Sequence, residues 1–401
     1  GVAAQQLTSS VNTYSPYSMY GMGELSTKGN VIQRSMGGIG VAMWSNNMVN
    51  VMNPAAYALT PQQSFLFNFG VEGGHFRNVQ DKFAANQTNL VRTAYITITG
   101  DVTVPTTYIQ DDHTVNIHDI AFQMPLAKNL GLGFSLTPYS NVGYNMYRDD
   151  LSDDIIGNIG RVNYQYTGDG DVTEVKAGLG WKPVRSLAIG VAAMYYWGSI
   201  NRSYNTVVTN ITGDGSYSST RGVDTYDVSR IKFQAGIMWN PIYRDDRILT
   251  LAATYDLGGP MKPKMFKHVY VDNVLNSVVR QEEDNALPLR LPHQVAAGFF
   301  YQTLKVRFGA DYVYQNWGTQ NTDFAESGGP GINVAYTDTH TIKAGFEIVP
   351  RYSDVAHYMN RMAYRIGARY GDYYQTFGGS RVKQYAVTAG IGLPIRLFGR
   401  S

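Results

Sequence analysis

The sequence predicts an all-β protein: a transmembrane antiparallel β-barrel of about twelve strands, with its N-terminal segment folded inside the lumen as a hatch. Three observations predict this fold class. Segments of strand length alternate apolar and polar residues, short turns alternate with long polar loops, and charged residues make up only 16% of the 401 residues. Soluble proteins usually contain about a quarter of charged residues. The longest uncharged apolar run, residues 187–197, is too short for a membrane helix.

The N-terminal part is typical of a compact plug. Small residues before Gln5 suit a secretory signal cleaved after Ala4. In residues 34–57 a glycine-rich patch permits close backbone approach, and a later Asn-Pro turn blocks both helix and central strand. The segment carries too many apolar residues to stay solvated as a linker. The residues that define this motif are Arg34, Gly37, Gly38, Gly40, Asn53, Pro54 and Ala55.

The three parts of this motif are Arg-Ser-Met-Gly-Gly, then Gly-Val-Ala, then Asn-Pro-Ala about a dozen residues later. Their order resembles the N-terminal hatch of the FadL/TodX family, which are outer-membrane transporters for long-chain fatty acids and other hydrophobic compounds. The resemblance implies a barrel of about fourteen strands in the outer membrane of a Gram-negative bacterium. It also implies a kink in the third strand that opens the wall toward lipid.

The first wall strand is predicted at residues 63–72, where Phe65, Phe67, Phe69 and Val71 alternate with smaller or polar residues. Residues 73–113 are predicted to be a long extracellular loop, with a hairpin at 91–104. The other long loops are predicted at 149–160, 204–224, 262–286 and 319–336. The remaining strands follow as hairpins with short turns, at 120–124, 130–147, 175–181, 187–197, 231–239, 249–255, 288–302, 304–318, 338–349, 361–376 and 381–393.

The third strand is the candidate lateral gate. Pro138 lies near its middle and cannot donate a hydrogen bond to a neighbouring strand, and Gly143 follows five residues later. A simple bulge filled by a side chain is the alternative. The gate residues are Pro138, Tyr139 and Gly143. Aromatic residues near strand ends are predicted to form interfacial girdles, namely Tyr139, Tyr164, Trp181, Trp197, Trp239 and Trp317.

The C-terminal residues 394–400 are typical of a turn rather than a closing strand. We therefore expect residues 1–62 to form the signal remnant and hatch, and residues 63–401 to form a barrel that lacks its last hairpin. Residues 63–72 and 381–393 should then not pair, leaving a gap about two strands wide. The other reading takes the two extra strands from 91–104 and 266–280.

Several kinds of chemistry have no support in the sequence. The chain has no Cys, so thiolate chemistry and Cys-type zinc sites are excluded. Asp111 to His113 are placed in a loop, and His118 and Asp119 are predicted to face opposite sides of a strand. No complete calcium loop, phosphate-binding loop or basic stripe is present. We therefore expect no enzyme, metal, cofactor or nucleic-acid partner.

Two functions fit these features. The first is an outer-membrane channel for passive uptake of hydrophobic compounds such as long-chain fatty acids, with membrane lipid and a hydrophobic ligand as partners. The second is a structural FadL-like subunit of a larger outer-membrane secretion or protein-insertion complex, with other outer-membrane proteins as partners. A hatch and a barrel serve both functions, and the sequence alone does not decide between them.

Overall fold

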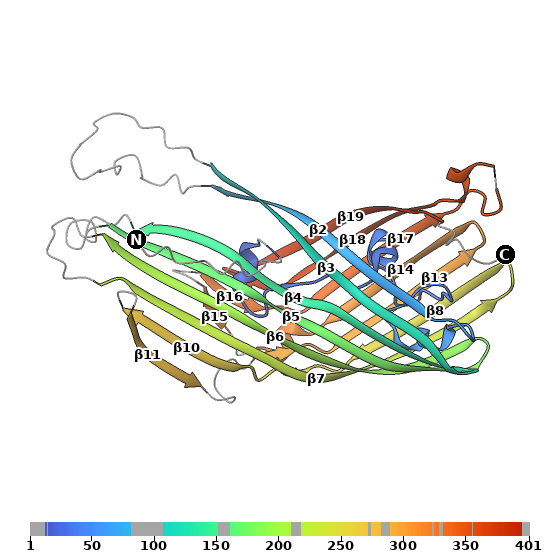
Figure 1. Cartoon of the computed structure of the whole chain (residues 1–401), viewed down its shortest axis with the longest axis horizontal. Coiled ribbons are helices and arrows are strands. Elements are labelled where there is room, and N and C mark those ends of the chain that lie inside the picture. The colour runs from blue at the N-terminus through green and yellow to red at the C-terminus, as the bar shows by residue number, and fades with distance from the viewer. Residues whose placement is uncertain are drawn as a thin grey trace.

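The computed structural model is a curled antiparallel sheet around a central N-terminal segment (Figure 1). It describes residues 13, 15–81, 107–150, 161–209, 218–271, 274–281, 289–322, 325–328, 332–354 and 356–394. The predicted hairpin at 91–104 lies outside the described residues. Within the described part of the chain, no helix is long and apolar enough to cross a membrane.

Within the described residues, twelve strands form the wall, joined in sequence by antiparallel ladders. The prediction of about twelve wall strands is therefore confirmed. In order along the wall they are β2 (Leu66–Asp81), β3 (Thr107–Ala127), β4 (Leu130–Asp150), β5 (Arg161–Val184), β6 (Leu187–Thr209), β7 (Thr220–Tyr243), β8 (Arg247–Asp256), β13 (Gln294–Thr303), β14 (Val306–Gln315), β17 (Thr339–Ile348), β18 (Ala363–Phe377) and β19 (Ser380–Gly392).

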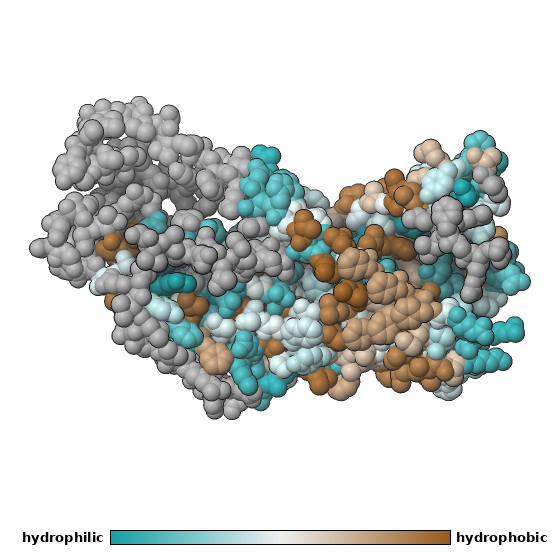
Figure 2. Space-filling view, in the orientation of Figure 1, coloured by the Kyte–Doolittle hydropathy of each residue, from teal (hydrophilic) through white to brown (hydrophobic). Residues whose placement is uncertain are grey.

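The strands form because every second residue is apolar and faces outward. Phe65, Phe67 and Phe69 are all more than half exposed, as a lipid-facing surface requires. Figure 2 shows the resulting apolar band on the face in view, over the part of the wall nearest the short turns. Two predicted girdle residues are exceptions: Trp317 is fully buried and Tyr139 is 9% exposed, so both point into the lumen instead.

The wall is much taller on one side than on the other. β4 to β7 are 21 to 24 residues long, whereas β8, β13, β14 and β17 have ten residues each. A tilted strand of about ten residues spans the hydrocarbon core of a bilayer. The short strands therefore end near the membrane surface, and the tall ones continue well beyond it.

Several segments predicted as loops are strands. β2 continues to Asp81 and β3 begins at Thr107, because the two strands stay paired above the apolar band. Residues 262–286 contain a hairpin, β10 (Lys264–Val271) and β11 (Val274–Gln281), which pairs with β7 above the end of β8. Residues 319–336 contain a second one, β15 (Ala325–Gly328) and β16 (Ile332–Tyr336). Outside the bilayer a strand needs no lipid-facing alternation, so these elements lack the sequence signal.

The wall is interrupted beside β3 and beside β19. The β3–β4 ladder ends at the pair Ile120–Leu136, and above it the β2–β3 hairpin leaves β4 and β5 (Figure 1). In the sheet order β19 stands next to β2, but no residue register joins these two strands within the described ranges. Tyr385 and Val387 on β19 are accordingly 82% and 80% exposed. A final hairpin beyond Ser401, and the width of the gap, stay predictions.

The N-terminal segment lies inside the wall (Figure 1). Its elements are η1 (Pro16–Met19), β1 (Glu24–Leu25), α1 (Val31–Ser35) and η2 (Pro54–Leu59). All six residues of η2 are buried, and η2 packs against β3 to β7. We call residues 13–62 the plug. We propose that residues 1–62 and 63–401 are separate hatch and barrel units; this division lies just before β2.

Glycines on the inner face of the wall make room for the plug. A Cβ atom added at Gly131 would lie 1.8 Å from the Tyr57 carbonyl oxygen, and one added at Gly190 would lie 2.4 Å from the Ala55 nitrogen. These glycines alternate with outward apolar residues such as Val191. One strand therefore presents a large apolar side chain to lipid and bare backbone to the plug.

Gly131→Ala should displace the plug without preventing barrel formation. The new methyl group meets plug backbone, which cannot rotate away as a flexible side chain would, and overpacking of this kind costs about 1–3 kcal/mol. We expect a lower thermal midpoint and faster proteolysis within residues 13–62. Gly73→Ala is the control. A Cβ atom added there lies on the outer side of β2, and the nearest atom to it is the Thr114 carbonyl oxygen at 3.9 Å. Equal effects of the two changes would contradict this packing.

Candidate functional site

Arg34 connects the plug to β2. Its two terminal guanidinium nitrogens donate to the carboxylate oxygens of Glu72 at 2.8 and 2.6 Å. The helix that carries it, α1, begins with a capping box between Asn30 and Gln33. On the other side of α1, the Thr388 hydroxyl of β19 donates to the Ser35 carbonyl at 3.1 Å. The helix therefore bridges β2 and β19, the two strands that share no register.

The glycine patch lies against the strands that follow β19 along the wall, β18 and β17, and against β14. Gly37 has a φ of 75° and approaches the backbone of β17 and β18 so closely that a Cβ atom would lie 2.5 Å from the Ala344 oxygen. Gly38, with a φ of 81°, lies near Lys343. The amide nitrogens of Gly40 and Val41 donate to the buried Asp311 carboxylate at 2.6 and 3.0 Å.

Asn53 organises the Asn-Pro-Ala part of the motif. Its side-chain oxygen accepts from the Ala55 amide at 3.0 Å and so caps η2, in which Pro54 is the first residue. Its side-chain nitrogen donates to the Val41 carbonyl at 2.9 Å. The side chain also lies against Gly236 of β7. The Gly-Val-Ala and Asn-Pro-Ala parts of the motif are therefore joined to each other and to the wall.

The candidate gate residues lie at the interruption between β3 and β4. The β4–β5 register shifts between Pro138 and Ser140, so Tyr139 bulges out of the ladder and turns into the lumen. The plug covers the edge of β4 that β3 leaves free. β1 pairs with Ser140 and Asn141, and the Gly143 amide donates to the Ser18 hydroxyl at 3.1 Å. The bulge at Tyr139 in the β4–β5 ladder and the break in the β3–β4 ladder therefore occur at the same place in β4.

The prediction that His118 and Asp119 face opposite sides is wrong. A bulge in the β2–β3 register, between Gly70 and Val71, places both side chains on the inner face, with exposures of 3% and 0%. The His118 Nδ1 atom lies 3.0 Å from the Asp119 carboxylate, and its Nε2 atom lies 3.1 Å from the Thr27 carbonyl of the plug. The pair joins β3 to the plug. Asp111 to His113, predicted in a loop, are part of β3.

Buried charges in the lumen, which the sequence analysis missed, connect the plug to the tall side of the wall. The Lys28 ammonium of the plug lies 3.1 Å from Glu174 of β5 and 3.8 Å from Asp256 of β8. Lys176 of β5 donates to the Val51 carbonyl of the plug at 2.5 Å. Burial alone lowers the pKa of Lys28, but the two carboxylates raise it above its usual value, so Lys28 stays charged.

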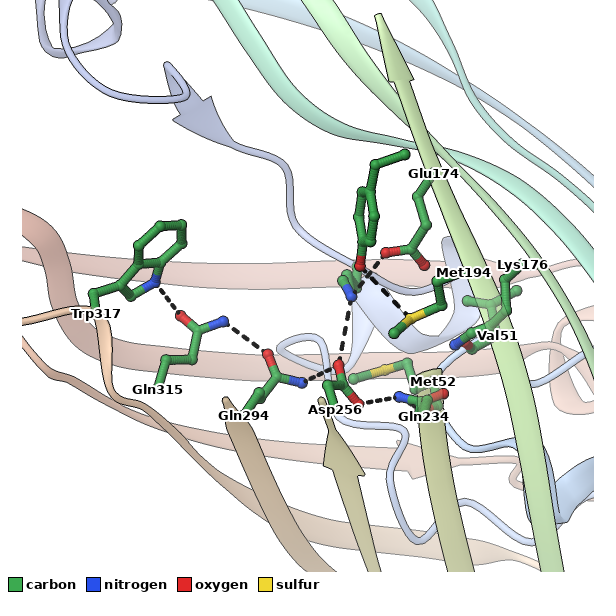
Figure 3. Close-up of polar contacts among 12 residues, drawn as sticks. Val51, Met52, Glu174, Lys176, Met194, Gln234, Asp256, Gln294, Gln315 and Trp317 are labelled. Carbon is green, nitrogen blue, oxygen red and sulfur yellow. Dashed lines mark hydrogen bonds and ion pairs between the residues drawn. The ribbon is translucent and has the colours of Figure 1, made fainter. Parts of the chain in front are cut away.

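A chain of amides extends from Asp256 to the short side of the wall (Figure 3). Gln234 and Gln294 donate to the two oxygens of Asp256 at 2.6 and 3.0 Å. Gln315 donates to Gln294 at 2.7 Å, and the Trp317 indole donates to Gln315 at 3.2 Å. We call this set, with Lys28 and Glu174, the lumen network. Charged and amide residues inside otherwise apolar strands, such as Glu174 and Lys176, are the sequence signal that could have revealed it.

The family model that matches the sequence is BamG, and it matches residues 2–401. The chain belongs to the BamG family. A search of the curated proteins found no match. Solved structures similar to this BamG-family barrel include the Ralstonia pickettii toluene transporter TbuX, with a TM-score of 0.51, 14% identity, and 88% of both chains covered. The resemblance to the FadL/TodX family expected from the hatch motif is confirmed at the level of the fold.

Two further structures share the fold of this BamG-family chain. A Pseudomonas aeruginosa FadL homologue has a TM-score of 0.51 and 14% identity, with 88% of this chain and 82% of that chain covered. The Pseudomonas putida toluene transporter TodX has a TM-score of 0.50 and 13% identity, with 87% and 84% covered. This fold and the apolar band place the protein in the outer membrane.

The lumen of this BamG-family barrel is closely packed around the lumen network. A cavity between plug and wall has a volume of about 20 Å³, which holds roughly one water molecule. Lys28, Tyr139, Met194 and Asp256 are among the residues that line it. In the described part of the lumen, this cavity is far too small for a fatty acid or an aromatic hydrocarbon.

Lys28→Met should loosen the plug. It leaves Glu174 and Asp256 buried beside a neutral side chain, and an uncompensated buried charge costs on the order of 3 kcal/mol. We expect a lower thermal midpoint and faster proteolysis of the plug, measured on the full chain in detergent. Adding Glu174→Gln should recover part of the loss, because one unpaired charge is removed. Lys305→Met, in an exposed turn, is the control. A midpoint unchanged by Lys28→Met would contradict the role of the ion pair.

Proposed function

We propose that this BamG-family barrel is a structural subunit of a larger outer-membrane assembly for secretion or protein insertion. The observation that carries this proposal is the close packing of the plug against the wall around the lumen network. The lumen network ties the plug to β5, β7, β8, β13 and β14, and the cavity beside it has room for about one water molecule. A barrel packed in this way supplies a rigid wall and outward surfaces for other proteins.

The β10–β11 hairpin is the proposed contact surface for such a partner. It stands on β7 above the membrane, and within the described ranges the one residue register of β11 is with β10. A strand with one unpaired edge offers free N–H and C=O groups to a strand of another protein. β8 lies below the hairpin and pairs with β7 and β13 independently of it.

Deletion of residues 264–281 should abolish partner binding and preserve the barrel. We expect the unmodified chain, extracted in mild detergent, to co-purify with other outer-membrane proteins, and the deletion variant to lose them. Heat-modifiable mobility on a denaturing gel would show that the variant still folds. If the unmodified chain behaved as a monodisperse single-chain particle under the same conditions, the proposal would be wrong.

The second candidate function is passive transport of a hydrophobic compound, such as a long-chain fatty acid, between the lumen and lipid. The specific observation in its favour is the opening between β3 and β4 above Leu136, at the bulge of Tyr139. The plug covers the edge of this opening through β1 and Ser18. Transport would therefore require the plug to move away from β4. The transporters among the similar structures support this candidate by fold alone.

A disulfide between β1 and β4 separates the two functions. Glu24 and Asn141 are cross-strand partners, and the chain has no native Cys. Replacing both residues with Cys should give a reducible bond, because partners in a ladder lie within the Cα range of about 4.4–6.8 Å that disulfides use. For a transporter, uptake of fatty acid into liposomes should stop on oxidation and return on reduction. Uptake no faster than in empty liposomes, in both states, would refute transport.

A further inference from the structure

Two histidines lie side by side on the outer face of the β2–β3 hairpin. His75 of β2 and His113 of β3 are direct cross-strand partners. Their Nδ1 atoms are 3.3 Å apart, and their ring centroids are 4.7 Å apart with an interplanar angle of 29°. The rigid ladder between the strands holds the two rings at this spacing. Neither histidine takes part in the contacts between plug and wall described above.

The pair lies just above the membrane-facing band. Val71, Val115 and Ile117 on the same outer faces are all more than half exposed, as lipid-facing residues are. His75 and His113 follow them in the direction away from the short turns, and the side chain of His75 is 54% exposed. The two imidazoles are therefore accessible from the aqueous side, at the level of the lipid head groups.

We propose that His75 and His113 form a binding site for a divalent transition metal such as Zn²⁺ or Cu²⁺. Imidazole nitrogen is a preferred ligand of both ions. A tetrahedral zinc ion with Zn–N bonds of about 2.0–2.1 Å separates two nitrogen ligands by roughly 3.4 Å. The Nδ1–Nδ1 distance of 3.3 Å matches this separation. The rings are stacked in the structure, so binding of one ion by both nitrogens requires the rings to rotate about their Cβ–Cγ bonds.

Asp111 supplies the positioning group. Its carboxylate oxygen lies 3.6 Å from the Nε2 atom of His75, within ion-pair range. Histidine ligands commonly direct their second ring nitrogen to a carboxylate, which keeps the proton on that nitrogen and leaves the other free to bind metal. Within the described residues, no group of three or more His, Cys, Asp or Glu side chains converges on one point. Two histidines and water therefore make up the site.

A bound metal would join the two strands where neighbouring strands give them no support. Above Ile120 the hairpin no longer pairs with β4, and β2 shares no register with β19. The Arg34–Glu72 ion pair holds the hairpin from the inner face. The metal site would act on the outer face of the same segment.

The test is metal titration of the full chain, purified without a histidine tag and treated with a chelator. We expect one equivalent of Zn²⁺ to bind in calorimetry, and Cu²⁺ to give an electron paramagnetic resonance spectrum with nitrogen ligands. His75→Ala and His113→Ala should each lower the affinity at least tenfold. Asp111→Asn should lower it about tenfold, as loss of a carboxylate partner usually does.

His340→Ala is the matched control. His340 is also exposed, but its Nδ1 atom is hydrogen-bonded to the Tyr312 hydroxyl and, among the described residues, no second histidine lies beside it in a ladder. The substitution should leave binding unchanged. All these side chains lie on the outer surface of the wall, and heat-modifiable mobility would show that each variant is folded. Affinity for Zn²⁺ that is the same in the His75→Ala, His113→Ala and unmodified chains would overturn the proposal.

Discussion

Inside a bilayer every backbone N–H and C=O group must find a partner within the protein, and the rest of this structure depends on that constraint. Most of the wall meets it by strand pairing. At the interruption beside β3 the plug provides partners instead, because β1 pairs with the free edge of β4. At β2 and β19, α1 contacts both strands through their side chains. The plug is therefore part of the wall's hydrogen bonding as well as the filling of its lumen.

The wall strands face lipid on one side and the plug on the other, and their residues differ accordingly. Along β4 to β6, outward residues such as Leu179 and Val191 face lipid, and inward glycines admit the backbone of η2. Deeper contacts are polar: the lumen network and Asp311 bind backbone amides and side chains of the plug. Apolar residues thus hold the barrel in the membrane, whereas close backbone contact and buried polar groups hold the plug in the barrel.

The twelve wall strands were predictable because lipid imposes apolar residues at every second position. The strands above the apolar band were predicted as loops. Residues 73–81 and the β10–β11 hairpin are strands in water, where no such pattern is needed. The bulge at His118 was beyond sequence reasoning, because a bulge is defined by the register of the partner strand. The bulge at Tyr139 was one of the two alternatives that Pro138 indicated. The hatch motif located the plug but gave no sign of Lys28 as its buried cation.

Because the wall is unequal in height, the two sides of the barrel that face neighbours in the membrane differ. β5 has 24 residues and β8 has ten, so at about 3.3 Å per residue one flank carries roughly 45 Å of additional strand. A neighbour that approaches sideways from this flank meets long wall strands far above the lipid, whereas one at β8 meets a short wall strand with the β10–β11 hairpin above it. Which proteins the barrel can contact in the membrane therefore depends on which flank it turns toward them.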